Sequence, residues 1–326
     1  MPQGTGGSNP SLSAIFRRHR HFRYHCLRAA FSTVTVKQYA PALSHPRAPA
    51  LLPPPFIFPK NRPPVAIPAA MLTLFIPSAY EAADFRRALA NPCKTHIGDT
   101  TVFTGTLEGV PLRLAVCGMG QPHSARRIAA VLEAIAPLRE TDLVWLAGFG
   151  GGLDPSLKRY DIVWLDGTAE DEAAATGPAT HPATLAPISA AIAATGASAR
   201  RIEKIYTSEV VVDTPEKKAA AFRETAAAIV DMETAPFLEL LKKHNRQGAV
   251  IRVISDDVSE EFPADLIGRS YDFAKGRTTP FRLAWHLFTH PSDIGRMRRS
   301  LAPLPEARRH LLRFIAAAVK STASAS

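Results

Sequence analysis

The first 70 residues of the sequence contain no aspartate and no glutamate, although the whole chain has 29 acidic residues. The lysines and arginines of this stretch account for nearly all of the formal net charge of +10. The rest of the chain is therefore close to neutral. Its charge gives no argument for nucleic-acid binding, and we expect no nucleic-acid partner.

The same stretch, residues 1–70, is rich in proline and includes the run Pro53-Pro54-Pro55. Such a segment cannot bury enough apolar surface to offset its ordering entropy, so we expect it to be a mostly disordered basic extension. Three origins stay open. They are a start assigned too early, an organelle targeting segment, which the acid-free Arg-rich composition resembles, and a true basic arm. We favour the first, because Met71 opens the strand-like LTLFIP.

Cysteine is also scarce. Cys26, Cys93 and Cys117 form no CxxC pair or other metal-binding spacing, so we expect no metal and no cofactor. An odd number of cysteines without a secretory segment fits the cytoplasm. No apolar run reaches the ~18 residues that a membrane span needs, and no Gly-Lys-Ser/Thr follows a glycine-rich turn as in a phosphate-binding loop of the Walker type.

From Met71 onward, strand-like and helix-like segments alternate. Strands are predicted at 72–77, 101–118 (a hairpin turning at Glu108-Gly109), 142–148, 161–166, 201–208, 228–232 and 249–256, and helices at 80–89, 124–138, 188–194, 217–226 and 234–243. This pattern predicts an α/β fold, a three-layer αβα sandwich with a mixed central sheet. We assign residues 71–260 to one domain and 261–326 to a lid loop and C-terminal helices of the same domain.

Three predicted strands end in polar or glycine-rich sequence, at residues 148–152, 231–233 and 255–257. Each has an ordinary explanation taken alone, as a turn or a helix cap. Together they predict a small-molecule pocket at one edge of the sheet, where strand ends converge. Arg252, inside the last of these strands, needs a buried partner.

The motifs GGLDPSLKRYDIV, VDMET and RVISD, in this order, resemble the superfamily of purine nucleoside phosphorylases and methylthioadenosine/S-adenosylhomocysteine nucleosidases. The resemblance covers about residues 71–260. A closer likeness is to the hopanoid-associated phosphorylase branch, through TSEVVVDTPEKKAAAF (207–222) and FRLAWHLFTHPSDIGRMRRSL (281–301).

This resemblance implies a nucleoside phosphorylase-like fold. It also implies an enzyme that cleaves the N-glycosidic bond of a purine nucleoside. Glu233 matches the glutamate that binds the ribose, and Asp256 matches the general acid that protonates the departing base. The resemblance implies contacts with sugar or base, or with the acid, for Met232, Ser255, Gly150, Gly151, Val211 and Val212. Asp231 and Asp257 are expected to have structural roles.

The nucleophile is either water or phosphate. The strand 142–147 and the loop 77–83 contain no arginine for a phosphate dianion, whereas Glu81 in that loop is a candidate to polarise water. Glu81 is equally an ordinary helix-start glutamate. We therefore predict a hydrolase. A phosphate-dependent phosphorylase is one alternative, and a non-catalytic nucleoside-binding protein is another.

Two further features concern the substrate. Phe149 stands where the nucleosidases have a small residue, so it either narrows the pocket or stacks on a base. The basic amphipathic stretch from Phe281 to Val319 suits an anionic membrane surface. Such a surface would suit an adenosylated lipid such as adenosylhopane, the substrate that the resemblance to the hopanoid branch implies, and a substrate like methylthioadenosine or S-adenosylhomocysteine is the other candidate. The alternative is a lid or a packing helix. A homodimer is expected, because the relatives commonly dimerise.

Overall fold

The structure, a computed structural model, describes residues 71–136, 142–167, 182–272, 277–278 and 280–324. Within these residues ten strands form one sheet, in the order β2-β3-β4-β1-β5-β10-β6-β7, with β9 paired to β5 and β8 paired to β9. The strands are β1 (Leu72–Ile76), β2 (Ala90–Ile97), β3 (Thr100–Leu107), β4 (Val110–Val116), β5 (Leu143–Gly152), β6 (Ile162–Gly167), β7 (Ala199–Arg201), β8 (Ile205–Thr207), β9 (Ile229–Asp231) and β10 (Gly248–Asp256).

The sheet is mixed, as predicted. Strand β1 runs parallel to β4 and β5, and β10 runs parallel to β5 but antiparallel to β6. Central strands of this kind carry apolar side chains on both faces. In β1, Leu74 belongs to one buried cluster and its neighbour Phe75 to another on the opposite face.

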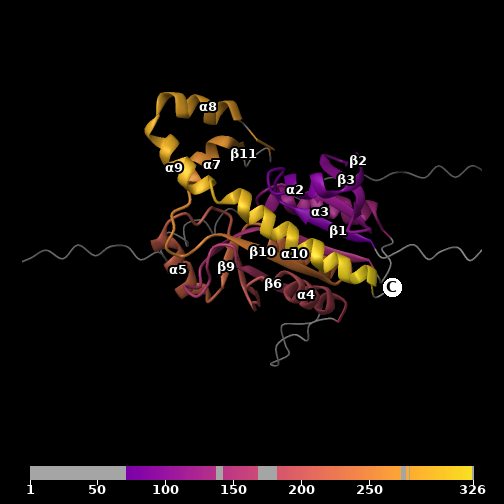
Figure 1. The fold of residues 1–326 in the computed structure, drawn as a ribbon. Helices are drawn as coiled ribbons and strands as arrows, with labels where there is room; N and C mark the ends of the chain where they lie inside the picture. The colour runs from indigo at the N-terminus through magenta and orange to yellow at the C-terminus, as the bar shows by residue number, and fades with distance from the viewer. Residues whose placement is uncertain (1–70, 137–141, 168–181, 273–276, 279, 325–326) are drawn as a thin grey trace, which may run out of the picture. The chain divides into compact units, whose positions relative to one another are not determined.

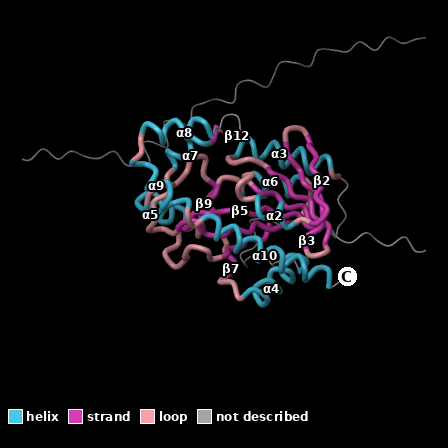
Figure 2. The backbone as a smooth tube through the Cα atoms, turned by 45° about the horizontal axis from the view of Figure 1, so that its top comes forward, coloured by secondary structure: helices cyan, strands magenta, loops and turns pink. Residues whose placement is uncertain are grey.

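Helices cover both faces of this sheet (Figures 1 and 2). Side chains of α2 (Ala83–Ala88), α4 (Pro182–Thr195) and α10 (Leu304–Ser324) join the cluster of Leu74, whereas α3 (Gln121–Ala134) and α6 (Thr234–Lys243) join that of Phe75. The three-layer αβα sandwich is therefore confirmed. The remaining helices are α5 (Pro215–Thr225), α7 (Ala264–Ser270), α8 (Pro280–Thr289) and α9 (Ser292–Leu301).

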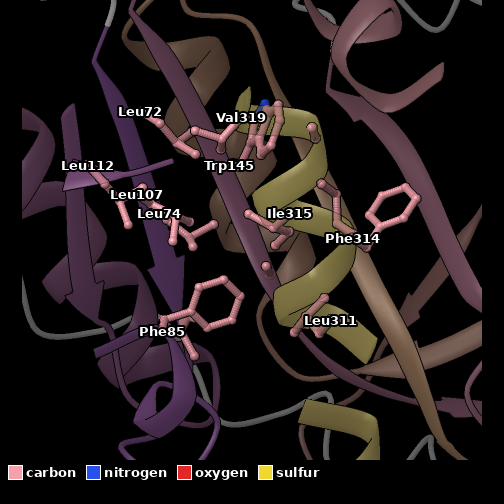
Figure 3. Close-up of a cluster of buried hydrophobic side chains, with 14 of the residues drawn as sticks. Leu72, Leu74, Phe85, Leu107, Leu112, Trp145, Leu311, Phe314, Ile315 and Val319 are labelled. Carbon is pink, nitrogen blue, oxygen red and sulfur yellow. The ribbon is translucent and has the colours of Figure 1, made fainter. Parts of the chain in front are cut away.

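Helix α10 belongs to the core. Leu311, Phe314 and Ile315 are completely buried against β1 and β5 residues such as Trp145 (Figure 3). Burial of each such side chain contributes about 1.5–3 kcal/mol. Of the two alternatives for this part of the chain, the packing helix is the correct one for α10 and the membrane surface is not, because the sheet occupies its apolar face. From the sequence, Pro305 was expected to interrupt the C-terminal helices. It instead lies in the first turn of α10, where a proline is tolerated.

Several boundaries differ from the predictions, and helix α4, for example, begins at Pro182 and not at Ile188. The segment 201–208 is two strands, β7 on the edge of β6 and β8 beside β9. Strand β5 continues through Gly152, so the glycine-rich segment is strand and not a turn. Strand β2 was not predicted, and neither was the short pair of β11 (Tyr271–Asp272) with β12 (Arg277–Thr278). Helix α7 was not predicted either, because its residues were assigned to the lid loop.

The hairpin of β3 and β4 was predicted correctly. Its central residues Glu108 and Gly109 both have positive φ, of 50° and 83°, as the twist of a two-residue hairpin turn requires. No helix among the described residues combines the length and the apolar character needed to cross a membrane.

Candidate active site

A pocket of about 400 Å³ lies where β5, β9 and β10 meet. All ten residues singled out in the sequence line it: Glu81, Phe149, Gly150, Gly151, Val211, Val212, Met232, Glu233, Ser255 and Asp256. The lining residues that sequence reasoning missed include Ser78, Tyr80, Met119, Val210, Phe262, Leu301 and Leu304. The convergence of the three strand ends on one pocket is confirmed.

The way these ends converge differs from the expectation. Gly151 of β5 pairs with Asp256 of the parallel strand β10 and with Val230 of β9, which is antiparallel. A side chain on Gly151 would crowd both neighbouring strands. A Cβ on Gly151 would lie 3.1 Å from Val230 and 3.4 Å from the Asp256 carboxylate. The absence of a side chain on Gly151 therefore leaves room for Val230 and for the Asp256 carboxylate.

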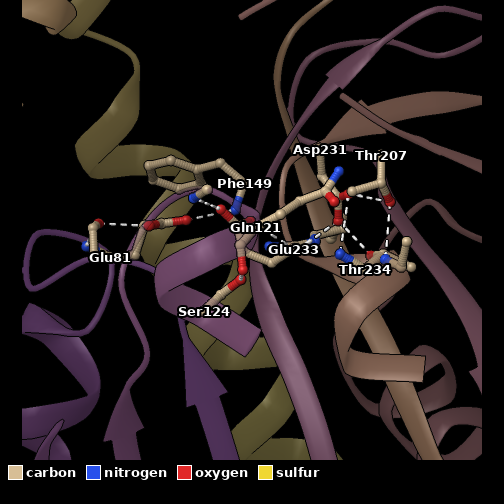
Figure 4. Close-up of polar contacts among 12 residues, drawn as sticks. Glu81, Gln121, Ser124, Phe149, Thr207, Asp231, Glu233 and Thr234 are labelled. Atoms are coloured by element: carbon tan, nitrogen blue, oxygen red, sulfur yellow. Dashed lines mark hydrogen bonds and ion pairs between the residues drawn. The ribbon is translucent and has the colours of Figure 1, made fainter. Parts of the chain in front are cut away.

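Arg252 of β10 is completely buried behind the pocket. It has buried carboxylate partners, as the sequence predicted. Its Nη2 lies 2.6 Å from Asp231 Oδ2 and 3.3 Å from Glu233 Oε2. Asp231 also accepts hydrogen bonds from Thr234 and from the hydroxyl of Thr207 (Figure 4). Asp231 therefore shapes the turn into α6, the structural role predicted for it.

Glu233 stands at the start of α6 without capping it through its side chain. Its carboxylate instead accepts a hydrogen bond of 2.9 Å from the backbone N–H of Gly120 and faces Arg252. Burial raises the pKa of Glu233 to about 7, although the Arg252 charge opposes this rise. Buried carboxyl groups with raised pKa values are common in functional sites and occur in structural ion-pair networks as well.

Glu81 is buried in the pocket and is not a solvated helix-start residue. The Ser78 hydroxyl and the backbone N–H of Phe149 donate to its two oxygens, at 2.5 and 2.8 Å (Figure 4). Burial raises its pKa. Gly148 separates Glu81 from Arg252: a Cβ there would lie 2.7 Å from Glu81 Oε1 and 2.6 Å from Arg252 Nη1.

Asp256 has both carboxylate oxygens engaged. The Ser255 hydroxyl lies 2.5 Å from Oδ1, and the ammonium group of Lys218 lies 2.5 Å from Oδ2. Sequence reasoning missed Lys218. A signal was present, since Lys218 precedes Ala221 by three residues and Phe222 by four, which places it on the apolar face of α5.

The rest of the wall is apolar or aromatic. The Tyr80 and Phe149 rings meet edge to face with centroids 6.4 Å apart, and the Arg308 guanidinium of α10 lies 4.4 Å from the centre of the Tyr80 ring. Burial raises the pKa of Tyr80. Leu301 and Leu304, from the junction of α9 and α10, line the pocket as well.

Comparison with known proteins agrees with this geometry. Residues 71–279 match the family model of the phosphorylase superfamily. The chain is 28% identical over 201 residues to a 5′-methylthioadenosine/S-adenosylhomocysteine nucleosidase of Anoxybacillus flavithermus, a match that covers 56% of this chain and 83% of the relative.

Solved structures share the fold. A 5′-methylthioadenosine/S-adenosylhomocysteine nucleosidase of Neisseria meningitidis, in complex with methylthio-immucillin-A, is similar at 20% identity, with a TM-score of 0.53 over 77% of this chain and 99% of that one. A futalosine hydrolase mutant of Helicobacter pylori is similar at 16% identity, with a TM-score of 0.56 over 78% of this chain and 100% of that one.

Proposed function

Because the chain belongs to the phosphorylase superfamily, we propose that it cleaves the N-glycosidic bond of a purine nucleoside by hydrolysis. The observation that carries this proposal is the presence of three buried carboxyl groups, those of Glu81, Glu233 and Asp256, in the lining of one pocket. The nucleosidase relative and the hydrolases of the same fold support it.

Each carboxyl group has a distinct task in this reaction. Asp256 protonates the departing base, and Ser255 holds its carboxyl group. Glu233 accepts hydrogen bonds from the ribose hydroxyls and stabilises positive charge on the sugar, with Met232 packed beneath the ring. Gly150 and Gly151 let sugar and base approach the strand, and the backbone of Val211 and Val212 meets the base.

Glu81 polarises the attacking water. Ser78 and the Phe149 N–H fix its carboxyl group, and Arg252 Nη1 lies on the other side of the small gap at Gly148. Arg252 is the one arginine at the centre of this site among the described residues, and Asp231 and Glu233 neutralise it. A phosphate dianion would meet a carboxylate-rich surface there, which favours water over phosphate as the nucleophile.

The test is release of adenine from adenosine, methylthioadenosine and an adenosylated lipid, with and without phosphate. Release without phosphate is expected. Release that requires phosphate would establish the phosphorylase instead. Binding of nucleosides without release of base would favour the non-catalytic binding protein.

The 5′ substituent of the substrate is proposed to be apolar. Phe262, Leu301 and Leu304 line the pocket together with Val210, and they offer no polar side chain to a hydrophilic substituent. This lining supports the hopanoid-like substrate, an adenosylated lipid, over S-adenosylhomocysteine with its charged amino-acid tail. Turnover of the adenosylated lipid exceeding that of S-adenosylhomocysteine is the expected result of the assay above.

We further propose that α8 contacts an anionic membrane. Phe281, Trp285 and Phe288 recur at intervals of four and three residues on one face of α8 and are 87%, 70% and 80% exposed. Arg282 beside them is exposed too, and aromatic residues flanked by arginine are typical of helices at a membrane surface.

Vesicle sedimentation tests this contact. Wild-type protein is expected to sediment with anionic vesicles, and Trp285→Ser with Phe288→Ser is expected to remove this binding. If the wild type stays in the supernatant and the double substitution instead converts a dimer to a monomer, α8 is the interface of the expected homodimer.

A further inference from the structure

The ammonium group of Lys218 is completely buried and fully hydrogen bonded. Its Nζ lies 2.5 Å from Asp256 Oδ2, 2.7 Å from the carbonyl oxygen of Asp257 and 2.8 Å from that of Glu260. A lysine ammonium has three N–H donors and no acceptor. All three donors are used, so the group is fixed in place.

Burial of this charge is not an accident of helix composition. Lys217, the preceding residue of α5, has a side chain that is 60% exposed and pairs with Asp213 at the surface. Burying a charged group costs free energy that a surface pair avoids, and an apolar side chain in its place would avoid that cost. The position of Lys218 therefore calls for a task beyond packing.

The contacts indicate the task. Lys218 holds one oxygen of Asp256 while the Ser255 hydroxyl holds the other, so the carboxyl group cannot rotate freely. The same ammonium group ties down the loop from Asp257 to Glu260, which leads to Phe262 in the pocket wall. Lys218 itself does not line the pocket.

We infer that Lys218 is a positioning residue for protonation of the departing base, acting only through Asp256. The inference rests on the proposed hydrolysis. In that reaction the C1′–N9 bond breaks and its electron pair passes to the base. The Asp256 carboxyl proton goes to N7, and water supplies the hydroxyl group to C1′ while its second proton passes to Glu81. A general acid must lie within about 2.6–3.2 Å of its acceptor and be aligned with it, which a fixed carboxyl group achieves.

The leaving group supplies the test. An adenine base needs a proton to depart, whereas the 4-nitrophenolate of 4-nitrophenyl β-ribofuranoside departs as a stable anion. Lys218→Met is therefore expected to lower kcat for adenosine or methylthioadenosine about 100-fold, the low end of what general acid catalysis contributes. KM for the nucleoside and kcat for the nitrophenyl riboside are expected to stay within about threefold.

Lys217→Met is the matched control, one residue away on the same helix, and it is expected to leave both substrates unaffected. In an Asp256→Asn background, Lys218→Met should cause no further loss, because two residues that act as one unit are not additive. Equal loss of both substrates, or no loss of either, would overturn the inference.

Folding of each variant is checked by its thermal unfolding. If Lys218→Met does not fold, Lys218→Gln keeps two donors and is expected to show the same split between the two substrates. Failure of both variants to fold would assign Lys218 to stability alone and overturn the inference. If the wild type releases no base from any nucleoside, the proposed hydrolysis itself fails, a result distinct from failure of the Lys218 variants.

Discussion

The guanidinium group of Arg252 and the carboxylate of Asp231 form an ion pair of 2.6 Å in which the side chains are 0% and 1% exposed. Arg252 comes from β10, which lies between β5 and β6 in the sheet, and Asp231 comes from β9, which is antiparallel to β5. The pair therefore fixes β9, and with it the turn that carries Glu233, against the centre of the sheet.

Loss of this pair should destabilise the protein. Asp231→Asn is expected to lower the free energy of unfolding by about 3–5 kcal/mol, because it leaves a buried guanidinium group short of charge compensation. Urea denaturation measures the change. Asp213→Asn removes the surface pair with Lys217 and should cost less than about 1 kcal/mol. Equal effects of the two substitutions would contradict the structural importance of the Asp231 pair.

Asp256→Asn should remove most of the activity and leave the fold intact. The amide oxygen can still accept a hydrogen bond from Lys218, but the amide has no acidic proton for the base, so kcat is expected to fall about 10²–10⁴-fold. Adenine release and circular dichroism check the two parts. Asp257→Asn is the control. Asp257 does not line the pocket, and its carboxylate accepts hydrogen bonds from the backbone N–H and the hydroxyl of Ser259. Wild-type turnover by Asp256→Asn would exclude it as the acid.

Glu233 should make stability depend on pH. Its pKa rises from 4.5 to about 7 on folding, so the stability that it contributes is complete below about pH 4.5 and is lost as the pH rises through about 7. Glu233→Gln does not ionise. Its melting temperature relative to wild type is therefore expected to increase from about pH 5 to about pH 8. Glu239→Gln, on the exposed side of α6, should show a constant difference. A constant difference for Glu233→Gln as well would mean that its pKa is not raised.

Gly148→Ala should disturb both stability and activity. The new methyl group would lie 2.6 Å from Arg252 Nη1 and 2.7 Å from Glu81 Oε1, so one of these groups has to move. We expect a loss of about 1–3 kcal/mol in the free energy of unfolding and a lower kcat. Gly268→Ala, at a position with no atom within 4 Å of the added Cβ, is the control and should be neutral or stabilising. If Gly148→Ala changed neither the free energy of unfolding nor kcat, the close approach of Glu81 and Arg252 at Gly148 would not matter for stability or activity.

The sequence was sufficient for the layers of the fold and for the pocket residues that follow the strands. The segments AIVDM and RVISD have apolar residues that predict buried strands, and the polar residues after them had to lie at strand ends. Their family resemblance then supplied roles that remain to be tested. The mixed pairing of β9, by contrast, depends on contacts between distant segments that no local pattern encodes.

Lys218 shows the same limit at a single position. The spacing of Lys218 to Ala221 and Phe222 places it on the apolar side of α5, but its partner Asp256 lies 38 residues further along the chain, and no local pattern joins the two. For helix α10 the sequence left two alternatives open for a related reason. Its arginines and apolar residues alternate as in a membrane-surface helix, but the sheet supplies the apolar surface on which Leu311 and Phe314 pack.

The contact between Arg308 and Tyr80 has a consequence for folding of the protein during its synthesis on the ribosome. Tyr80, one residue before Glu81, is translated 228 residues earlier than Arg308, whose guanidinium group covers its ring and donates to its carbonyl oxygen. Until α10 has been synthesised, the loop that carries Glu81 lacks its contact with Arg308, and β1 lacks the helix that packs on it. The pocket is therefore completed only after translation has passed through α10, and a nascent chain that stalls before that helix carries every proposed catalytic side chain in an unfinished site.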